Sequence, residues 1–173
     1  MRDRTMPPDI ALRPEVAADG PAVDRLYAAA FGPGRFSRTA YRLRGARPFD
    51  PAVSFVAERR GFVLGAIRQN RVRVGGAPAY LLGPLAVAQT AAKQGIGRAL
   101  MAASLDAARA GPAVAIVLIG DAPFYSPLGF DPAGGIVMPE PVEPHRLLAM
   151  PLQGTVSGRL DPAPWLSAPP STR

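Results

Sequence analysis

The chain has 173 residues, a formal net charge of +7 and no cysteine. This length matches one domain that can bury its own core, and the lack of cysteine excludes disulfides, thiolate metal sites and a cysteine nucleophile. No run approaches the roughly 20 apolar residues that a membrane helix needs, and residues 1–10 mix charges with prolines, unlike a signal peptide. We therefore expect a cytoplasmic protein with no membrane association.

The positive charge makes nucleic-acid binding one hypothesis, because clustered arginines neutralise phosphates. Lys93 is the only lysine, however, and the arginines are scattered from Arg2 to Arg173. The same charge suits an anionic cofactor or an acidic substrate equally well. No recognised nucleic-acid reader motif is present, so a basic nucleic-acid-binding protein ranks third among our hypotheses.

The first third of the chain predicts one strand and two helices. Residues 10–14 alternate as a short strand, and Asp19 is a candidate N-cap for a helix that ends at Phe31. Ser37 can cap the second helix. An arginine cluster follows, which we expect to face solvent, with selection of an acidic acceptor as the alternative: Arg35, Arg38, Arg42, Arg44 and Arg47.

The middle of the chain predicts a three-stranded meander, because β-branched and aromatic residues fall between turn signals. The strands are expected at 53–58, 62–74 and 80–87. Proline cannot donate a ladder hydrogen bond, so Gly83 and Pro84 predict a bulge or a splay in the third strand.

A long helix and a buried strand come next. Residues 93–110 predict a helix with one apolar stripe, formed by Ile96, Leu100, Ala103 and Ala107. The continuous apolar run 113–119 is typical of a strand buried on both faces. Strand, helix and strand predict a parallel crossover unit, and hence an α/β or α+β sandwich.

The last part of the chain is rich in proline and turn residues. Short strands are predicted at 136–138 and 147–152. We expect a single domain over residues 1–160 and a Pro-rich tail over 161–173. His145 is the only histidine; without partners it predicts a loop residue and no metal site.

A glycine turn separates the meander from the long helix. Residues 94–99 follow a strand and open a helix, where backbone N–H groups and the helix dipole combine into an anion site. A Rossmann fingerprint would need a small residue at Leu100, and a P-loop would need Gly-Lys-Ser/Thr; neither is present. By itself the turn fits a phosphate site or a tight corner without a ligand.

The same order of elements continues into the sequence Phe-Tyr-Ser-Pro-Leu-Gly-Phe at 124–130. Residues 81–130 resemble the acyl-CoA-binding core of the GNAT superfamily of N-acetyltransferases, with its Gln/Arg-x-x-Gly-x-Gly/Ala turn and its later Phe-Tyr-x-x-x-Gly-Phe. They are most similar to a group of small bacterial predicted acetyltransferases with the phrase Leu-Gly-Pro-Leu-Ala-Val, here 82–87. The resemblance implies an α+β fold with a mixed, mostly antiparallel sheet of about six to seven strands, about four helices and a splayed central strand pair.

The resemblance also implies acetyl-CoA as co-substrate. The backbone of Leu85, Ala86 and Val87 would pair with the pantetheine arm. The pyrophosphate would bind mainly to backbone N–H groups, with Lys93 and Arg98 adding charge. The residues implied to bind the cofactor are therefore Leu85, Ala86, Val87, Lys93, Gln94, Gly95, Ile96, Gly97, Arg98, Ala99 and Phe124. The family's first Gln or Arg falls at Ala92, so one side-chain contact is missing.

Tyr125 matches the family tyrosine that protonates the departing thiolate. A phenol with a pKa of about 10 is protonated at neutral pH and can act as general acid. The alternative is an aromatic pair with Phe124 that only packs. Asp121 and Glu58 are the candidate general bases; a water relay, or a capping or surface role for either carboxylate, is the alternative.

The leading hypothesis is therefore an N-acetyltransferase. The neutral amine of a small molecule or a protein would attack the acyl carbonyl directly, with no covalent acyl-enzyme. A CoA-binding module without catalysis is the second hypothesis, supported by Ala92 and by the unplaced base. The resemblance further suggests a homodimer formed through late strands.

Overall fold

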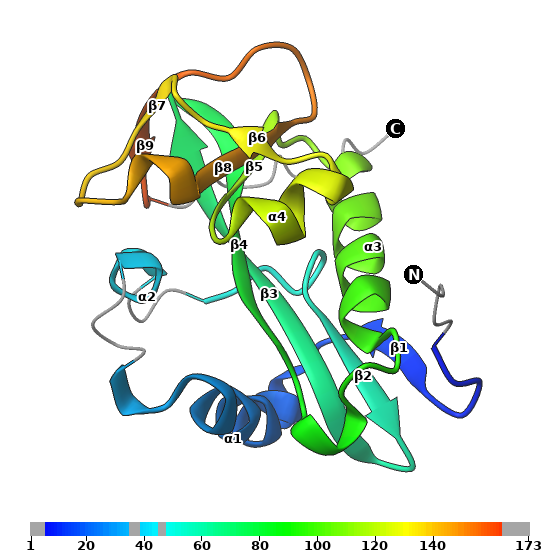
Figure 1. Cartoon of the computed structure of the whole chain (residues 1–173). Helices are drawn as coiled ribbons and strands as arrows, with labels where there is room; N and C mark the ends of the chain where they lie inside the picture. Colours follow the sequence, from blue (N-terminus) through cyan, green and yellow to red (C-terminus); the bar gives the residue numbers. More distant parts are fainter. Residues whose placement is uncertain (1–5, 35–38, 45–47, 164–173) are drawn as a thin grey trace. The chain divides into compact units, whose positions relative to one another are not determined.

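The computed structural model describes residues 6–34, 39–44 and 48–163 (Figure 1). They form two compact units: the described parts of 1–70 and 82–112 make the first, and residues 71–81 with the described part of 113–173 make the second. Two long strands, β3 (Phe62–Val74) and β4 (Ala77–Val87), contribute to both units.

In the first unit, β1 (Ala11–Pro14) pairs antiparallel with β2 (Phe55–Arg59), and β2 pairs antiparallel with β3. The turn between β2 and β3 has positive φ at Arg60 (52°) and Gly61 (82°), as a two-residue type I′ hairpin requires. The expected hairpin is confirmed, although β2 begins two residues later than predicted.

Two helices of the first unit, α1 (Gly20–Phe31) and α3 (Ile96–Arg109), lie on opposite faces of β3 (Figure 1). Successive residues of a strand face opposite sides. Gly65 faces α3 so closely that a Cβ there would lie 2.9 Å from Leu100 Cδ1, whereas Ala66 packs in the core under α1. A third helix, α2 (Thr39–Arg44), carries the exposed Arg42.

Asp19 stands at the N-cap position of α1, as predicted, but its carboxylate is used elsewhere. Its side chain makes no capping hydrogen bond to α1. The carboxylate instead accepts from the Arg13 guanidinium at 2.6 and 2.8 Å and from the Val16 N–H at 2.9 Å. A nearby guanidinium thus competes successfully with the helix N–H groups for this acceptor.

The prediction for α3 also needs two corrections. The helix begins at Ile96, because Lys93 and Gly95 take positive φ angles of 61° and 78° that no helix tolerates. Its fully buried face runs through Ser104, while Ala103 and Ala107 are only half-buried. A serine replaces an apolar residue on this face because its hydroxyl forms hydrogen bonds inside the core.

The second unit is built around β5 (Ala115–Ile119). β5 pairs in parallel with residues 79–81 of β4 and antiparallel with β8 (Leu147–Pro151). The expected parallel pairing of the strands before and after α3 is therefore confirmed. A short helix, α4 (Ala122–Tyr125), follows β5.

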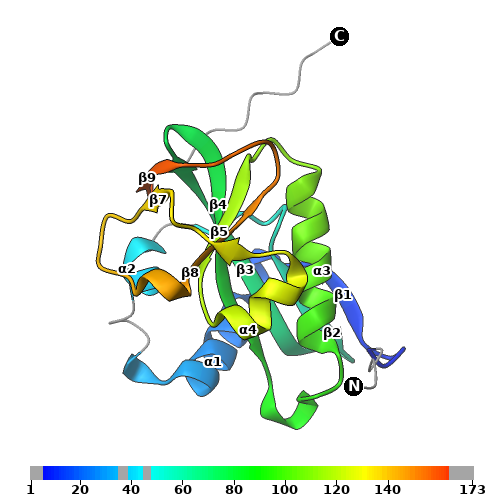
Figure 2. The same cartoon turned by 45° about the horizontal axis from the view of Figure 1, so that its top comes forward.

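Three further strands of this unit are short. β6 (Asp131–Pro132) pairs with β8, and β9 (Gly158–Asp161) pairs with the end of β3. β7 (Ile136–Val137) runs parallel to β9 (Figure 2). The described residues thus contain nine strands instead of six to seven, because strands of two to four residues carry little periodic signal.

The expected α+β class, with a mixed and mostly antiparallel sheet and four helices, is confirmed. Ser37, Arg35, Arg38, Arg47 and residues 164–173 lie outside the described residues. β9 reaches Asp161, so the first residue of the predicted tail belongs to a strand. The single-domain boundary at residue 160 stays a prediction.

Candidate functional site

The strand β4 has β3 and β5 as its two neighbours, but it pairs with β5 over only part of its length. Its parallel pairing with β5 covers residues 79–81. Further along, the Ala88 N–H just after β4 donates to the Leu64 carbonyl of β3 at 2.7 Å. The predicted interruption at Gly83 and Pro84 falls directly after the end of the β5 pairing.

The direction of the backbone groups in this last part of β4 follows from that bond. In an antiparallel pair, N–H groups of alternate residues point to the same neighbour. Since Ala88 points its N–H at β3, the N–H groups of Leu85 and Val87 point away from β3. This is the edge to which the pantetheine arm was predicted to bind.

The turn before α3 contains two glycines with different physical roles. Gly95 is left-handed, with φ at 78°, so the backbone itself favours glycine there. Gly97 is not left-handed, and a Cβ there would meet only Val87 Cγ2, at an ordinary 3.7 Å. The fold therefore does not require glycine at position 97, whereas a phosphate that approaches the backbone would.

The first turn of α3 offers several N–H groups to a ligand. The Ala99 N–H donates to the Gly95 carbonyl at 3.0 Å. The N–H groups of Ile96 and Gly97 precede this bond and belong to the group that has no acceptor within a helix. Such a turn attracts anions through its N–H groups and its dipole.

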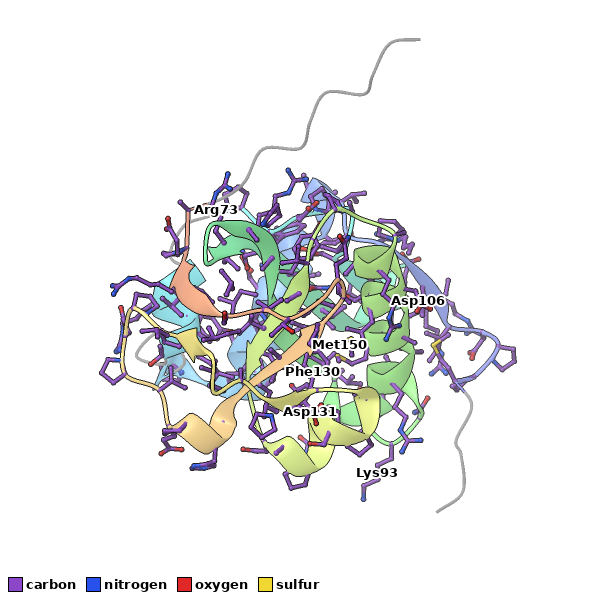
Figure 3. The ribbon with its side chains drawn as sticks, turned by 90° about the horizontal axis from the view of Figure 1, so that it is seen from above. Arg73, Lys93, Asp106, Phe130, Asp131 and Met150 are labelled. Carbon is purple, nitrogen blue, oxygen red and sulfur yellow. The ribbon has the colours of Figure 1, made fainter. Side chains whose placement is uncertain are left out.

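Cationic side chains surround this turn. Lys93 and Arg98 are exposed, and Lys93 points outward from the ribbon (Figure 3). Arg59, which the sequence analysis missed, lies with its NH2 group 3.5 Å from Gln94 Oε1 and its Nε 2.9 Å from Asp9 Oδ2. Ala92 is exposed and contributes no polar side chain.

Tyr125 belongs to the second unit and is held by its neighbours. Its ring lies against the backbone of Gly120, where any Cβ would overlap ring atoms. The rings of Phe124 and Phe130 meet it edge-on, with centroids 4.8 and 5.9 Å away. Tyr125 is half-buried and Phe124 is 51% exposed, so the tyrosine is fixed in place while one side of the pair stays accessible.

The two candidate bases differ in their surroundings. Glu58 accepts from Arg13 Nε at 2.9 Å through Oε2 and from the Gly61 N–H at 3.1 Å through Oε1. One oxygen therefore connects β2 to Arg13 of β1, and the other holds the turn of the β2–β3 hairpin. Asp121 is 79% exposed and lies 3.3 Å from Arg146 Nε. Assignment of the base stays a hypothesis for both.

A buried polar cluster under α1 escaped the sequence analysis. The Glu15 carboxylate is fully buried and accepts from Arg68 Nε at 3.0 and 2.9 Å. The Arg68 guanidinium lies over the rings of Phe49 and Tyr27, at 4.5 and 5.5 Å from their centroids. The Tyr27 hydroxyl donates to the Pro84 carbonyl at 3.1 Å. The cluster therefore connects a buried carboxylate to the interrupted part of β4.

Burial alone would lower the pKa of Arg68, but the hydrogen bonds and charge of Glu15 outweigh it and raise that pKa. The guanidinium is therefore charged at any accessible pH. No sequence signal could have revealed this cluster, because its members come from four separate segments. Arginine is mostly exposed in proteins, so an arginine within a strand is expected to face solvent.

Membrane spans and metal clusters are both absent from the described residues. No helix among them is long and apolar enough to cross a bilayer. In the same residues, no group of three or more His, Asp or Glu side chains is arranged to hold a metal ion. His145 is exposed in a short 3-10 turn, as expected for a loop residue.

The mixed, mostly antiparallel sheet and the four helices agree with the α+β fold that the resemblance to GNAT acetyltransferases implied. Residues 50–132 match the model of the acetyltransferase (GNAT) domain family. This match assigns residues 50–132 to the GNAT family of acetyltransferases. The sequence matches no curated protein.

Solved structures agree with this assignment. YhbS from Escherichia coli, a GNAT family N-acetyltransferase in complex with CoA, is 24% identical; the match covers 92% of each chain, with a TM-score of 0.76. A GNAT family acetyltransferase from Brucella melitensis in complex with acetyl-CoA is 28% identical, over 86% of this chain and 94% of that one, with a TM-score of 0.63. The ribosomal-protein-S18-alanine N-acetyltransferase from Escherichia coli shares the fold at 19% identity, over 84% and 96% of the chains, with a TM-score of 0.58.

Proposed function

We propose that this protein transfers an acetyl group from acetyl-CoA to a primary amine. The observation that carries the proposal is Gly97, which the fold does not require and whose missing side chain leaves the first turn of α3 approachable. Crystals of the Escherichia coli and Brucella melitensis relatives contain CoA and acetyl-CoA, which supports the same substrate here.

The residues present suit this substrate. We assign the pantetheine arm to the backbone edge of Leu85, Ala86 and Val87, where the Val87 N–H points away from β3; the Leu85 N–H points the same way and is assigned to the acyl carbonyl. The pyrophosphate is assigned to the N–H groups of the turn at 94–99, with positive charge from Lys93, Arg98 and Arg59. Phe124 stays a proposed contact of the same substrate.

In the proposed reaction, the neutral amine nitrogen forms a bond to the thioester carbonyl carbon, and the carbon–sulfur bond breaks. The electron pair leaves with sulfur, and the Tyr125 hydroxyl donates its proton to that thiolate. The extra proton on the former amine passes to a base, either Asp121 or Glu58 or a water molecule, and solvent returns a proton to Tyr125. The Leu85 N–H is the proposed donor to the developing oxyanion.

A CoA-binding module without catalysis is the second candidate. Two observations favour it: Ala92 lacks the family's polar side chain, and both oxygens of Glu58 are already engaged by Arg13 and Gly61. Such a module would bind acetyl-CoA and leave the thioester intact in the presence of amines. Turnover therefore separates the two candidates.

The test combines calorimetric titration of acetyl-CoA with measurement of thiol release, with and without a panel of amines. Gly97→Glu should abolish binding, because it places a carboxylate where the phosphates are expected. Gly134→Glu is the matched control, since position 134 is exposed and a Cβ added there would meet no atom within 4 Å. Tyr125→Phe should bind acetyl-CoA normally and slow thiol release by roughly 10²-fold, within the range typical of a lost general acid.

Three results would count against the proposal. Absence of binding by the wild type near millimolar acetyl-CoA would reject the substrate. Equal loss in Gly97→Glu and Gly134→Glu would reject the phosphate turn. Unchanged thiol release in Tyr125→Phe would reject the tyrosine as the acid.

A further inference from the structure

We propose that Tyr27 is a positioning residue that sets the orientation of the Pro84–Leu85 peptide, and thereby aims the Leu85 N–H at the acyl carbonyl. The inference rests on the proposed function and lies entirely within the first unit. It assigns a role in the reaction to a residue of α1 that touches neither the substrate nor the reacting atoms.

The central observation is a buried hydrogen bond between a helix and a strand. The Tyr27 hydroxyl donates to the Pro84 carbonyl at 3.1 Å, and Tyr27 is only 3% exposed. Pro84 has no N–H and cannot contribute the ladder bond that another residue would donate. At this point a side chain from α1 therefore supplies a constraint that the sheet cannot supply.

One bond fixes two groups because the peptide is planar. In a trans peptide the carbonyl of Pro84 and the N–H of Leu85 lie in one plane and point in opposite directions. Holding the carbonyl therefore also holds the N–H, which points away from β3. A donor on the carbonyl oxygen also polarises the same amide, and so strengthens its N–H as a donor.

Tyr27 is itself held in place by charge and packing. The Arg68 guanidinium lies 5.5 Å from its ring centroid, and Arg68 is fixed by the fully buried Glu15. Tyr27 also belongs to the buried core cluster of the unit, together with Val23 and Leu26. The hydroxyl thus has little freedom, as expected of a group that orients another.

The test removes one oxygen atom. Tyr27→Phe keeps the ring against Arg68 and deletes the bond to Pro84. In ¹⁵N-labelled protein without substrate, the Leu85 amide proton should move upfield, because its peptide loses the polarising donor. Thiol release from acetyl-CoA should fall roughly tenfold, less than the 10²–10³ typical for loss of an oxyanion donor, while the acetyl-CoA Kd stays within about twofold because most binding contacts remain.

Two further variants separate this role from simple destabilisation. Tyr41→Phe deletes a hydroxyl from another tyrosine of the first unit, and should leave both the Leu85 amide and thiol release unchanged. Val23→Ala loosens the same core without touching the Pro84 carbonyl. It should lower the free energy of unfolding, but should slow thiol release much less than Tyr27→Phe does.

The proposal is overturned if Tyr27→Phe leaves the chemical shift of the Leu85 amide proton unchanged. It is also overturned if Val23→Ala slows thiol release as much as Tyr27→Phe does. Failure of the proposed function looks different. In that case the wild type releases no thiol, whether or not it binds acetyl-CoA, although the amide shift in Tyr27→Phe can still appear.

Discussion

The two units of this chain have different kinds of interior. Every buried polar or charged side chain found among the described residues belongs to the first unit: Glu15, Asp19, Asp50, Ser54, Gln69, Asn70 and Ser104. The second unit, apart from Tyr80, buries apolar side chains such as Val117, Phe130 and Leu148. One interior therefore depends on hydrogen-bond geometry, and the other depends on shape.

The polar interior fixes the helix that carries the proposed phosphate turn. Gln69 Nε2 donates to Ser104 Oγ at 2.8 Å, and Ser104 Oγ donates to the Val53 carbonyl at 2.6 Å. These bonds join α3 to β3 and to the segment before β2. Because breaking a buried hydrogen bond is costly, such a network favours one position of the helix along the strand. A purely apolar contact would tolerate sliding.

The largest effect is expected from breaking the charged pair of the first unit. Glu15→Gln leaves the Arg68 guanidinium without its buried counter-charge and should lower the free energy of unfolding by about 3 to 4 kcal/mol, measured by urea denaturation. Glu143→Gln, at an exposed site, should change it by less than about 0.5 kcal/mol.

The double variant Glu15→Met with Arg68→Met sharpens this result. It removes both charges, and should recover most of the loss because apolar replacements of a buried pair are often close to neutral. A double variant as unstable as Glu15→Gln would show that the pair contributes more than charge compensation. The loss in Glu15→Gln could then not be attributed to the unpaired guanidinium alone.

The second unit should lose stability through a cavity instead. Leu148 is fully buried on β8, and Leu148→Ala should cost about 3 kcal/mol. The cost should be the same at low and at high salt, because no charge is involved. Val137→Ala, at a position that is 57% exposed, is the control in the same unit. A strong salt dependence in Leu148→Ala would mean that the apolar description of this interior is wrong.

Where local chemistry decides the structure, the sequence predicted it. The turn at Arg60 and Gly61, the strand β3 and the buried run of β5 each depend on residues within a few positions of one another. The glycine turn alone left two readings open, and the motif around Tyr125 was identified through its resemblance to the GNAT superfamily. The predicted start of α3 was wrong because Lys93 takes a left-handed conformation. This conformation is uncommon for residues other than glycine, so a lysine in the sequence does not predict it.

Contacts between segments that are far apart in the sequence were not predicted. Glu15 and Arg68 are 53 positions apart, and neither side chain differs in the sequence from a solvated one. The hydrogen bonds from the Arg13 guanidinium to the Asp19 carboxylate form only when β1 and the start of α1 are already in place. The short strands β6 and β7 exist only because longer strands offer them partners.

A smaller effect is expected at Gly120 of the second unit, whose backbone lies against the ring of Tyr125, the proposed general acid. Gly120→Ala places a Cβ inside the Tyr125 ring and must displace it. We expect a loss of about 1 to 2 kcal/mol in stability, and a roughly tenfold slower thiol release with little change in the acetyl-CoA Kd, as a displaced acid predicts. Gly134→Ala, at an open position, should alter neither quantity. Unchanged thiol release in a folded Gly120→Ala protein would separate Tyr125 from the reaction.

The smallest effect is expected at Asp19, and it should depend on pH. Hydrogen bonds from the Arg13 guanidinium lower the pKa of the Asp19 carboxyl, and outweigh the burial that raises it. A lowered pKa stabilises the fold above the unfolded-state value of about 3.9, and this stabilisation is lost as the pH falls through the folded-state value. Asp19→Asn should therefore cost about 1 kcal/mol at pH 7, a modest figure because Arg13 is partly exposed to solvent.

The same comparison at low pH decides whether charge is the cause. Below about pH 4 the difference between wild type and Asp19→Asn in urea denaturation should shrink, because the wild-type carboxyl becomes protonated as well. Asp106→Asn, on the exposed face of α3, should show no such convergence. If the Asp19→Asn difference were constant from pH 7 to pH 3, the hydrogen bond to the Val16 N–H, and not the Arg13 charge, would hold the entry to α1. The first unit would then depend on its polar geometry even where its charges are removed.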